Sequence, residues 1–391
     1  MHDILFAYDF PPLGGGIARM MEELARGYPA GELVVSTGSI EGQDAVDRVL
    51  PARVDRIAVA VGRLKTLQGR VLWSRRAVRL AREPGARFVW CGTLRPAGYP
   101  AQWAWKRTGL PYGVIFYGGD LRVLQPKLAR SWLKRRAYRP LFESASVLVA
   151  ISAWTATLLA DQLRALGLDH LVSRIHVVGL GTSPERFRAD AEAAERFRVG
   201  RGLPEGRWFV TVARLVPHKG IDTAIRVLAQ LAPEFPELRY AVIGRGGYLD
   251  QLQRLATELG VHDRVHFLTD VTDNELPGAY AMGEIYLGLS REVGLDAEGF
   301  GISLLEAAAT ELPVVAGASG GIADAVADGE TGLLVAPGDV EAAVGAVRHL
   351  LANRTLAHQL GAKGRQRVLE RFTWDAVVTK FRRLAAEHGR P

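Results

Sequence analysis

Short β-rich runs alternate with longer helical patterns along the whole chain, and the alternation starts again near its middle. Such alternation is typical of parallel sheets covered by helices on both faces. In the first half the expected strands are Ile4–Tyr8, Leu33–Val35, Phe88–Cys91, Val114–Phe116, Val147–Ile151 and Ile175–Val178. In the second half they are Trp208–Ala213, Tyr240–Ile243, Val265–Leu268, Ile285–Leu289, Val314–Ala316 and Leu333–Val335. The predicted fold class is α/β, with two doubly wound parallel-sheet domains in tandem.

The length of 391 residues also favours two domains, because a single hydrophobic core stops growing below this size. A stretch rich in glycine and proline between Gly179 and Arg207 is predicted to connect them. We place the first domain at residues 1–183 and the second at residues 184–372. In sheets of this kind ligands bind beyond the carboxyl ends of the strands, so we expect a cleft between two facing domains.

The composition is that of a globular protein, with 48% apolar and 23% charged residues. The sequence contains no run of about 18 apolar residues, so we expect no membrane-spanning helix. The N-terminus moves directly into a strand-like run, unlike a secretory signal, and the single Cys91 cannot form an internal disulfide. We therefore expect a cytoplasmic location.

The net charge of +7 is unevenly distributed along the chain. Residues 1–184 hold 25 Lys+Arg and 14 Asp+Glu (25 − 14 = +11), and residues 185–391 hold 24 and 28 (24 − 28 = −4). The densest basic segment contains Lys127, Arg130, Lys134, Arg135, Arg136 and Arg139. Leu124, Leu128 and Trp132 fall there at helical spacing, which predicts an amphipathic helix that touches an anionic membrane surface from the cytoplasmic side. The alternative is a solvated basic face. Aromatic residues are sparse in this segment, which argues against a surface that binds nucleic acid.

A glycine-rich turn, Gly14-Gly15-Gly16, joins the first expected strand to a helix. Glycines let backbone approach a ligand, and the start of a helix offers free N–H groups to an anion. The turn lacks the G-x-G-x-x-G pattern because Arg19 occupies its last position, which weakens a nicotinamide interpretation. An ordinary turn without a ligand remains the alternative.

Two cations stand at the end of the first strand of the second domain. Arg214 and Lys219 are five positions apart in a loop that enters a helix near Gly220. Converging on a diphosphate, they would stabilise the charge that grows as it leaves. No Asp-x-Asp pair is present to hold a divalent ion, so we expect these cations to replace a metal and we predict no metal site and no cofactor. Two surface charges on a loop are the alternative.

The segment from Glu298 to Glu306 places two carboxylates eight positions apart, with two glycines ahead of an apolar helical run. The helix after Gly301 offers unpaired N–H groups to the same diphosphate. Glu306, one turn into that helix, is expected to accept ribose hydroxyls, and Glu298 to reach the sugar ring. Either could instead be a helix-dipole or solvent-exposed charge. Gly244, after the second strand of this domain, is a further expected donor contact.

The chain resembles the GT-B retaining glycosyltransferases of family four, which include the bacterial phosphatidylinositol mannosyltransferases. The resemblance covers nearly the whole length. It is strongest in Arg214–Gly220 and Glu298–Glu306, with further matches at Gly14–Gly16, Ile151–Thr155, Ser319–Gly321 and Phe372–Trp374. It implies a GT-B fold, in which the last segment, residues 373–391, crosses back to an acceptor-binding first domain.

The resemblance also implies that the second domain holds a sugar nucleotide. Arg214 and Lys219 would take the diphosphate and Glu306 the ribose. The donor sugar would lie against Glu298 and the backbone of Gly299, Phe300, Gly301 and Ile302. From the first domain, Gly15 and Gly16 would approach the donor.

The base of the nucleotide would lie near Val271, with Asp273 at a position that guanine-binding members use. Val293-Gly294-Leu295-Asp296 is similar to the mannosyltransferase branch and favours GDP-mannose as donor. Relatives that use UDP-sugars share the neighbouring Glu-Gly-Phe-Gly segment, so a UDP-sugar stays open.

One departure from the family concerns the acceptor side, where Asp9, Tyr117 and Asp120 are the expected residues. Tyr117 stands where many relatives place a His. A phenol donates a hydrogen bond to a sugar hydroxyl, but its ordinary pKa near 10 makes it a poor general base. In this family the departing diphosphate itself helps to remove the acceptor proton. An aromatic residue at a strand edge is the alternative interpretation of Tyr117.

The sequence therefore predicts a retaining, metal-independent hexosyltransferase with a lipid-linked, glycan or small-molecule acceptor. Within enzymes, the rivals are an inverting transferase or a sugar-nucleotide epimerase on the same architecture. From another class, the rival is a non-catalytic protein that binds nucleotide sugars or polyanions.

Overall fold

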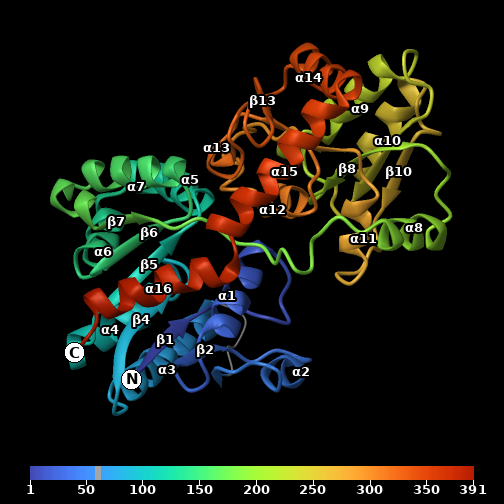
Figure 1. Ribbon diagram of the computed structural model, residues 1–391. Helices are drawn as coiled ribbons and strands as arrows, with labels where there is room; N and C mark the ends of the chain where they lie inside the picture. Colours follow the sequence, from blue (N-terminus) through green and yellow to red (C-terminus); the bar gives the residue numbers. More distant parts are fainter. Residues whose placement is uncertain (58–62) are drawn as a thin grey trace. The chain divides into compact units, whose positions relative to one another are not determined.

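The computed structural model describes residues 1–57 and 63–391, which form two compact units (Figure 1). Unit 1 comprises Met1–Leu180 and Trp374–Pro391, and unit 2 comprises Gly181–Thr373. The expected boundary at residue 183 and the expected return at residue 373 lie close to these limits. Each unit is described by itself below.

Unit 1 contains a seven-stranded, all-parallel sheet in the order β3-β2-β1-β4-β5-β6-β7. Its strands are β1 (His2–Phe6), β2 (Leu33–Gly38), β3 (Arg53–Ile57), β4 (Ala86–Cys91), β5 (Tyr112–Phe116), β6 (Val147–Ala150) and β7 (Ile175–Val177). The six strands expected from the sequence are present. β3 was not predicted, because it is an edge strand whose Arg53, Asp55 and Arg56 interrupt the apolar pattern.

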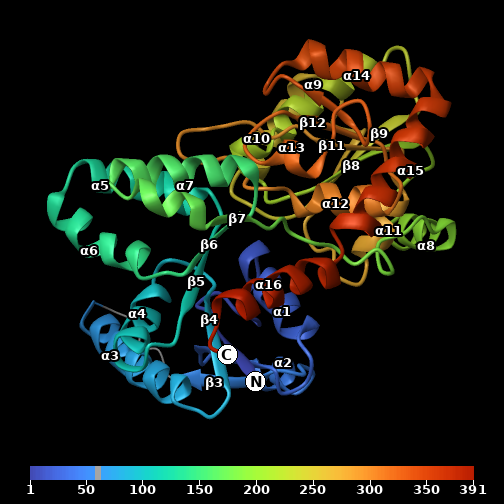
Figure 2. The ribbon, with the colours of Figure 1, turned by 60° about the vertical axis from the view of Figure 1, so that its left-hand side comes forward.

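Helices cover both faces of this sheet, with α1 and α16 on one face and α3, α4 and α6 on the other (Figure 2). The helices are α1 (Gly16–Gly27), α2 (Gln43–Asp47), α3 (Arg63–Ala81), α4 (Gly98–Thr108), α5 (Gly119–Ala129), α6 (Trp132–Glu143), α7 (Ala153–Ala165) and α16 (Trp374–His388), with a 3-10 helix at Asp169–Arg174. α16 contacts α1 and β4, so the last helix of the chain completes the first unit, as the resemblance implied.

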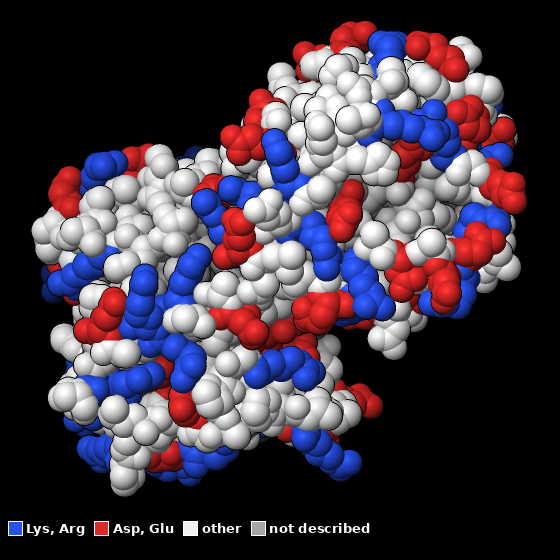
Figure 3. All heavy atoms as spheres, viewed as in Figure 1, with Lys and Arg blue, Asp and Glu red and all other residues white. Residues whose placement is uncertain are grey.

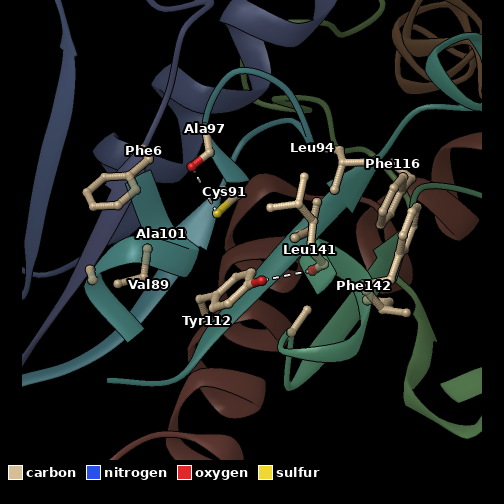
Figure 4. Packing of buried hydrophobic residues seen from close by; sticks show 14 of the residues in the cluster. Phe6, Val89, Cys91, Leu94, Ala97, Ala101, Tyr112, Phe116, Leu141 and Phe142 are labelled. Carbon is tan, nitrogen blue, oxygen red and sulfur yellow. Dashed lines mark hydrogen bonds between the residues drawn. The ribbon is translucent and has the colours of Figure 1, made fainter. Parts of the chain in front are cut away.

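The core of unit 1 lies between the sheet and the α4–α6 side (Figure 4). Phe116 stacks on Phe142 with ring centres 5.8 Å apart, and the Tyr112 hydroxyl donates to the carbonyl of Leu141 at 2.8 Å. Burial raises the pKa of the Cys91 thiol, which lies fully inside this core. The single cysteine is therefore a packing residue.

The basic segment forms two helices where the sequence predicted one. α5 ends at Ala129, and Ser131 caps the start of α6 by accepting a hydrogen bond from the backbone of Lys134 at 3.3 Å. Trp132 consequently leaves the apolar stripe predicted for it, and 70% of its surface is exposed. The helical spacing of the apolar residues did not reveal that Ser131 caps the start of a second helix.

Unit 2 contains a six-stranded, all-parallel sheet in the order β10-β9-β8-β11-β12-β13. Its strands are β8 (Arg207–Val212), β9 (Leu238–Ile243), β10 (Val265–Leu268), β11 (Ile285–Gly288), β12 (Val314–Gly317) and β13 (Leu333–Val335). Its helices are α8 (Ala191–Gly200), α9 (Ile221–Leu231), α10 (Leu249–Glu258), α11 (Leu276–Ala281), α12 (Ile302–Ala309), α13 (Ile322–Ala325), α14 (Val340–Ala352) and α15 (Arg354–Arg371), with a 3-10 turn at Pro217–Lys219. All six expected strands are present.

The main core of unit 2 packs α9 and α14 against β8, β9 and β11. The predicted connection between residues 179 and 207 is not a plain linker, because it contains α8, which packs on α11. Its glycines and prolines flank that helix. Among the helices of the described residues, none has the length and apolar character needed to cross a membrane.

Candidate active site

The loop between β8 and α9 positions Lys219. Lys219 ends a short 3-10 turn, and Gly220 follows with a left-handed backbone, at φ 66°. A Cβ atom on Gly220 would lie 1.8 Å from the carbonyl oxygen of Leu289, just after β11. Only glycine permits this approach, so Lys219 is held at the carboxyl edge of the sheet.

Glu298 lies between β11 and α12 and receives a hydrogen bond from Nζ of Lys219. The two side chains are mostly covered, with 16% of Lys219 and 17% of Glu298 exposed. Burial opposes ionisation of Glu298, but the charge and hydrogen bond of Lys219 outweigh it and lower the pKa of the carboxyl. Glu298 is therefore an ionised acceptor for hydroxyl groups at neutral pH.

Arg214 adds a second positive charge beside this pair. Its side chain is exposed, forms no ion pair with another described residue, and contributes to the lowered pKa of Glu298. His218 is buried under the same loop, and burial followed by the charge of Lys219 lowers its pKa, so it stays neutral. A cavity of about 10 Å³ bordered by Lys219, Glu298 and Ser303 is near the smallest that holds a water molecule.

The turn Ser319-Gly320-Gly321 fixes the backbone of Glu298 from the other side. The N–H of Gly321 donates to the Glu298 carbonyl at 2.8 Å. Gly320 has φ 60°, and a Cβ atom there would lie 2.0 Å from the same oxygen. The sequence carries this triplet as a family match, but no pattern in it indicates contact with Glu298.

The segment from Gly299 to Ile302 leads into α12. Phe300 is only 1% exposed, and its ring packs on Phe372 with centres 5.8 Å apart, so its side chain belongs to the core. Only the backbone of this segment is suited to ligand contact. Gly301 caps α12, and the first turn of the helix carries no acidic residue that would repel an anion.

Glu306 lies inside α12 with 9% of its surface exposed. The hydroxyl of Tyr280 donates to its Oε2 at 2.6 Å. Burial, followed by the charge of Glu306, raises the pKa of Tyr280 well above its usual range, so this donor keeps its proton. One carboxylate oxygen is thus anchored by the protein, and the ribose contact of Glu306 stays a prediction.

The remaining predicted residues of unit 2 lie in loops at the ends of β9 and β10. Val271 and the exposed Asp273 follow β10, where Arg201 holds the loop through Glu275 at 2.7 Å. Gly244 follows β9 and packs against the residue before Arg214. Contact of these residues with a nucleotide base stays a prediction.

The residues predicted for the acceptor side, together with the glycine turn, belong to unit 1. Gly14–Gly16 is exposed between β1 and α1, and a Cβ atom on any of these glycines would meet no atom within 4 Å. Packing therefore does not require a glycine triplet at this turn. Burial raises the pKa of Asp9 in the same loop.

Tyr117 and Asp120 follow β5. The Tyr117 hydroxyl donates to Sδ of Met20 at 3.7 Å, and burial, with Asp120 and Asp9 nearby, raises its pKa well above the usual range. The phenol therefore keeps its proton at neutral pH, and its role at the acceptor side stays a prediction. Oδ1 of Asp120 accepts from the backbone of Tyr117 and Leu121 at 3.1 and 3.0 Å, while burial raises the pKa of this carboxyl to about 6.

Arg291 is a positioning residue that the sequence did not indicate. Its guanidinium binds both carboxylate oxygens of Asp222 at 2.8 Å, and its backbone N–H donates to the carbonyl of His218 at 2.8 Å. The bidentate pair holds Arg291 at the start of α9, and the backbone hydrogen bond of Arg291 holds the residue before Lys219. Arg291 and Asp222 are 69 positions apart, so no local pattern links them.

Comparison with known proteins accounts for this arrangement. A model of glycosyl transferases group 1 matches residues 174–367, and a model of a glycosyl transferase 4-like domain matches residues 15–181. A GDP-mannose-dependent alpha-(1-6)-phosphatidylinositol monomannoside mannosyltransferase from Mycolicibacterium smegmatis is 32% identical, over 95% of this chain and 94% of the relative. The chain belongs to the group 1 glycosyltransferases. The mannosyltransferase of the same description from Mycobacterium tuberculosis is 31% identical, over 97% and 96% of the two chains.

Solved structures share the fold of this glycosyltransferase. Anabaena HepE, in complex with UDP and glucose, superimposes with a TM-score of 0.79 over 99% of both chains at 18% identity. Sucrose-phosphate synthase from Thermosynechococcus elongatus has a TM-score of 0.77 over 99% of this chain at 21% identity. At these identities the likeness shows the GT-B fold alone. No group of three or more His, Cys, Asp or Glu side chains suited to a metal occurs within residues 1–57 and 63–391, and metal independence stays a prediction.

Replacing Arg291 with alanine is expected to raise the KM of this glycosyltransferase for its donor about tenfold. The segment that holds His218 through its backbone loses its charge-assisted hydrogen bonds to Asp222, worth about 1.5 kcal/mol or more, and no longer fixes the Lys219 loop as firmly. The matched control is Arg207→Ala, which breaks an equally bidentate pair with Glu284 (2.6 and 2.7 Å) at the amino end of β8. Steady-state kinetics and melting temperatures should show similar destabilisation in both variants but a raised KM only in R291A. An equal rise in KM would mean that Arg291 acts through stability alone.

Proposed function

We propose that this glycosyltransferase moves a hexose from a nucleoside diphosphate sugar to an acceptor hydroxyl with retention of configuration, forming an α-glycosidic bond. The observation that carries the proposal is the Lys219–Glu298 pair beside the start of α12. It combines a fixed cation, an ionised acceptor and a helix end that favours anions. Together these groups suit a diphosphate joined to a sugar ring that carries hydroxyl groups.

In the transfer step, the bond between sugar C1 and the diphosphate oxygen breaks, and the diphosphate leaves with the electron pair. Arg214 and Lys219 stabilise the charge that grows on it, at about 1.5–3 kcal/mol for each charge-assisted hydrogen bond. The acceptor oxygen bonds to C1 on the same face, and its proton passes to the departing diphosphate. This scheme needs no protein base, which accommodates Tyr117, and the cations take the place of a divalent ion.

GDP-mannose is the donor that we propose. Its support is twofold: the full-length relatives from Mycolicibacterium smegmatis and Mycobacterium tuberculosis are described as GDP-mannose-dependent, and Val293–Asp296 is similar to the mannosyltransferase branch. In this assignment Glu298 binds the sugar hydroxyls, Glu306 the ribose, and the loop with Val271 and Asp273 the guanine. A UDP-sugar is the alternative.

A donor panel tests this proposal. At 100 times its dissociation constant, GDP-mannose should add about 2.7 kcal/mol to the free energy of unfolding, and UDP-glucose, UDP-N-acetylglucosamine and ADP-glucose should add much less. Transfer should persist in excess EDTA, and NMR of the product should show the α-anomer. Stabilisation by UDP-sugars alone would contradict GDP-mannose as the donor. A β-anomer in the product would contradict retention of configuration. If no sugar nucleotide gave turnover, the proposed mechanism would be wrong.

We further propose that unit 1 contacts an anionic membrane through residues 127–139. Trp132 and Leu133, which are 70% and 61% exposed, lie between Arg130 and Lys134 at the corner of α5 and α6. Basic side chains gather over unit 1, whereas both signs are interspersed on unit 2 (Figure 3). Exposed tryptophan beside cations suits the lipid headgroup region.

The double variant K134Q/R136Q is expected to weaken binding to phosphatidylserine vesicles about thirtyfold, since each basic residue near the surface contributes about 1 kcal/mol. Arg135 is left in place because its side chain donates to the carbonyl of Leu128 at 2.8 Å and supports α5. Removing two exposed cations of unit 2, in R196Q/K363Q, is the control. Co-sedimentation that is equal for the two double variants would count against this surface.

A further inference from the structure

A cavity of about 280 Å³ lies in unit 1, beyond the carboxyl ends of β4 and β5, and is bordered by α5 and by Tyr138 of α6. Its floor is apolar: Leu94, Phe116, Leu121 and Leu124 line it and are buried. Leu94 lies in the loop after β4, Phe116 ends the neighbouring strand β5, and Phe116 stacks on Phe142 of the core (Figure 4). The floor therefore belongs to the packed core and is preformed for an apolar group.

The lining of the cavity also includes the charged residues Arg95, Lys127 and Asp120. Arg95 lies 5.6 Å from the ring centre of Tyr99 and 5.3 Å from that of Tyr138, and it donates to the Tyr138 hydroxyl. Lys127 supplies a second cation, on the exposed side of α5. Asp120 is the single acidic residue of the lining. Two cations against one carboxylate favour an anionic group, and the stacked Arg95 is held in a fixed direction.

The surroundings of the cavity extend this charge. Residues 119–143, which span α5 and α6 beside the cavity, contain 7 Lys+Arg and 2 Asp+Glu (7 − 2 = +5). Val123, 42% exposed, lines the cavity from α5, the helix that leads into the corner with the exposed Trp132 and Leu133. An apolar cavity beside an exposed apolar corner in a cationic field fits an amphiphile with a negative headgroup.

We propose that this cavity takes one hydrocarbon chain of an anionic lipid acceptor, while Arg95 and Lys127 bind its phosphate. The inference rests on the proposed transferase function, whose acceptor it names by class. A sugar is a poor occupant, because the buried floor offers its hydroxyls few partners. A small anion alone would leave that floor without a partner.

The test is isothermal titration of the full-length protein, without donor, with dihexanoyl- and dioctanoyl-phosphatidylinositol below their micelle concentrations. Glycerophosphoinositol serves as the chain-free headgroup and dioctanoyl-phosphatidylcholine as the zwitterionic control. If one chain is buried, its two extra methylenes should tighten binding about tenfold. Phosphatidylcholine should bind at least about tenfold more weakly than the anionic lipid of equal chain length.

Two substitutions at the exposed edge of the cavity test its apolar part and its cationic part separately. Val123→Trp should fill the mouth and abolish the dependence on chain length, whereas Val199→Trp, at an exposed valine of α8, should not. Lys127→Gln should weaken every anionic ligand about tenfold, whereas Lys106→Gln, on the exposed side of α4, should not. If V123W does not fold, the chain-length series and K127Q still decide the matter.

Equal affinity for glycerophosphoinositol and dioctanoyl-phosphatidylinositol would overturn the proposal, as would an unchanged chain dependence in a folded V123W variant. Because binding is measured without donor, it is read independently of transfer. Chain-dependent binding with no turnover in the donor panel would leave the cavity assigned and remove the proposed function. Turnover in the donor panel without chain-dependent binding would keep the proposed function and contradict the assignment of the cavity.

Discussion

Replacement of Lys219 by alanine is expected to lower kcat/KM for sugar transfer about a hundredfold. The variant would lose the hydrogen bond that we propose between Lys219 and the leaving diphosphate, a charge-assisted bond worth about 1.5–3 kcal/mol. It also removes the attraction that keeps the pKa of Glu298 low, while the burial that raises this pKa remains. The carboxyl of Glu298 should then take up a proton as the pH falls toward the acid range. Residual activity of K219A should therefore rise with pH more steeply than that of the parent protein.

The matched control for this prediction is Arg348→Ala. It breaks an ion pair with Glu234 of 2.8 Å, but both side chains are more than 40% exposed and lie outside the predicted site. Exposed pairs contribute about 0–1 kcal/mol, so transfer by R348A should be unchanged. In the double variant K219A/E298Q the unpaired buried charge is gone, and its melting temperature should exceed that of K219A. Activity of K219A within twofold of the parent protein would contradict the assigned role of the lysine.

Replacement of Gly320 by alanine is expected to lower transfer by at least about a hundredfold. The new Cβ atom would lie 2.0 Å from the carbonyl oxygen of Glu298, so either the turn or the Glu298 segment must move. Movement breaks the hydrogen bond from Gly321 to that carbonyl. A displacement of about 1 Å at a reacting centre can cost about a hundredfold in rate.

Gly329 provides a control with the same backbone strain and no clash. Its φ is 69°, close to the 60° of Gly320, and a Cβ atom there would meet nothing within 4 Å. Gly329→Ala should therefore lose about 1–2 kcal/mol of stability and keep its activity. Rates normalised to folded protein, with melting temperatures for both variants, make the comparison. If G320A and G329A lose activity equally, left-handed strain explains the result and the contact with Glu298 does not.

Much of the fold was predictable because its signals are local. Buried parallel strands are short apolar runs, and all twelve that were expected are present. β3 was missed because an edge strand tolerates the charges of Arg53, Asp55 and Arg56, which hide its period. The break between α5 and α6 was missed because it depends on one cap, Ser131, inside a continuous helical pattern. At β3 the apolar period itself is hidden, whereas between α5 and α6 one local hydrogen bond overrides a period that is present.

The candidate site was predictable in its residue types more than in its contacts. Arg214, Lys219 and Glu298 were chosen because cations and carboxylates at the carboxyl ends of parallel strands suit a diphosphate sugar. Their roles in binding the donor stay predictions. Arg291, by contrast, carries no signal in the sequence, because an arginine after a strand is common and its partner Asp222 lies in another element.

By itself, the sequence predicted twelve of the strands, the presence of two similar domains and the kinds of side chain available at the strand ends. These follow from periodicity and turn chemistry, which act over a few residues. Only the tertiary structure decided that Lys219 meets Glu298 across 79 positions, and that Gly220 and Gly320 each leave room for a carbonyl oxygen from a distant segment. Such contacts depend on how closely two backbones pack, and no local pattern encodes that distance.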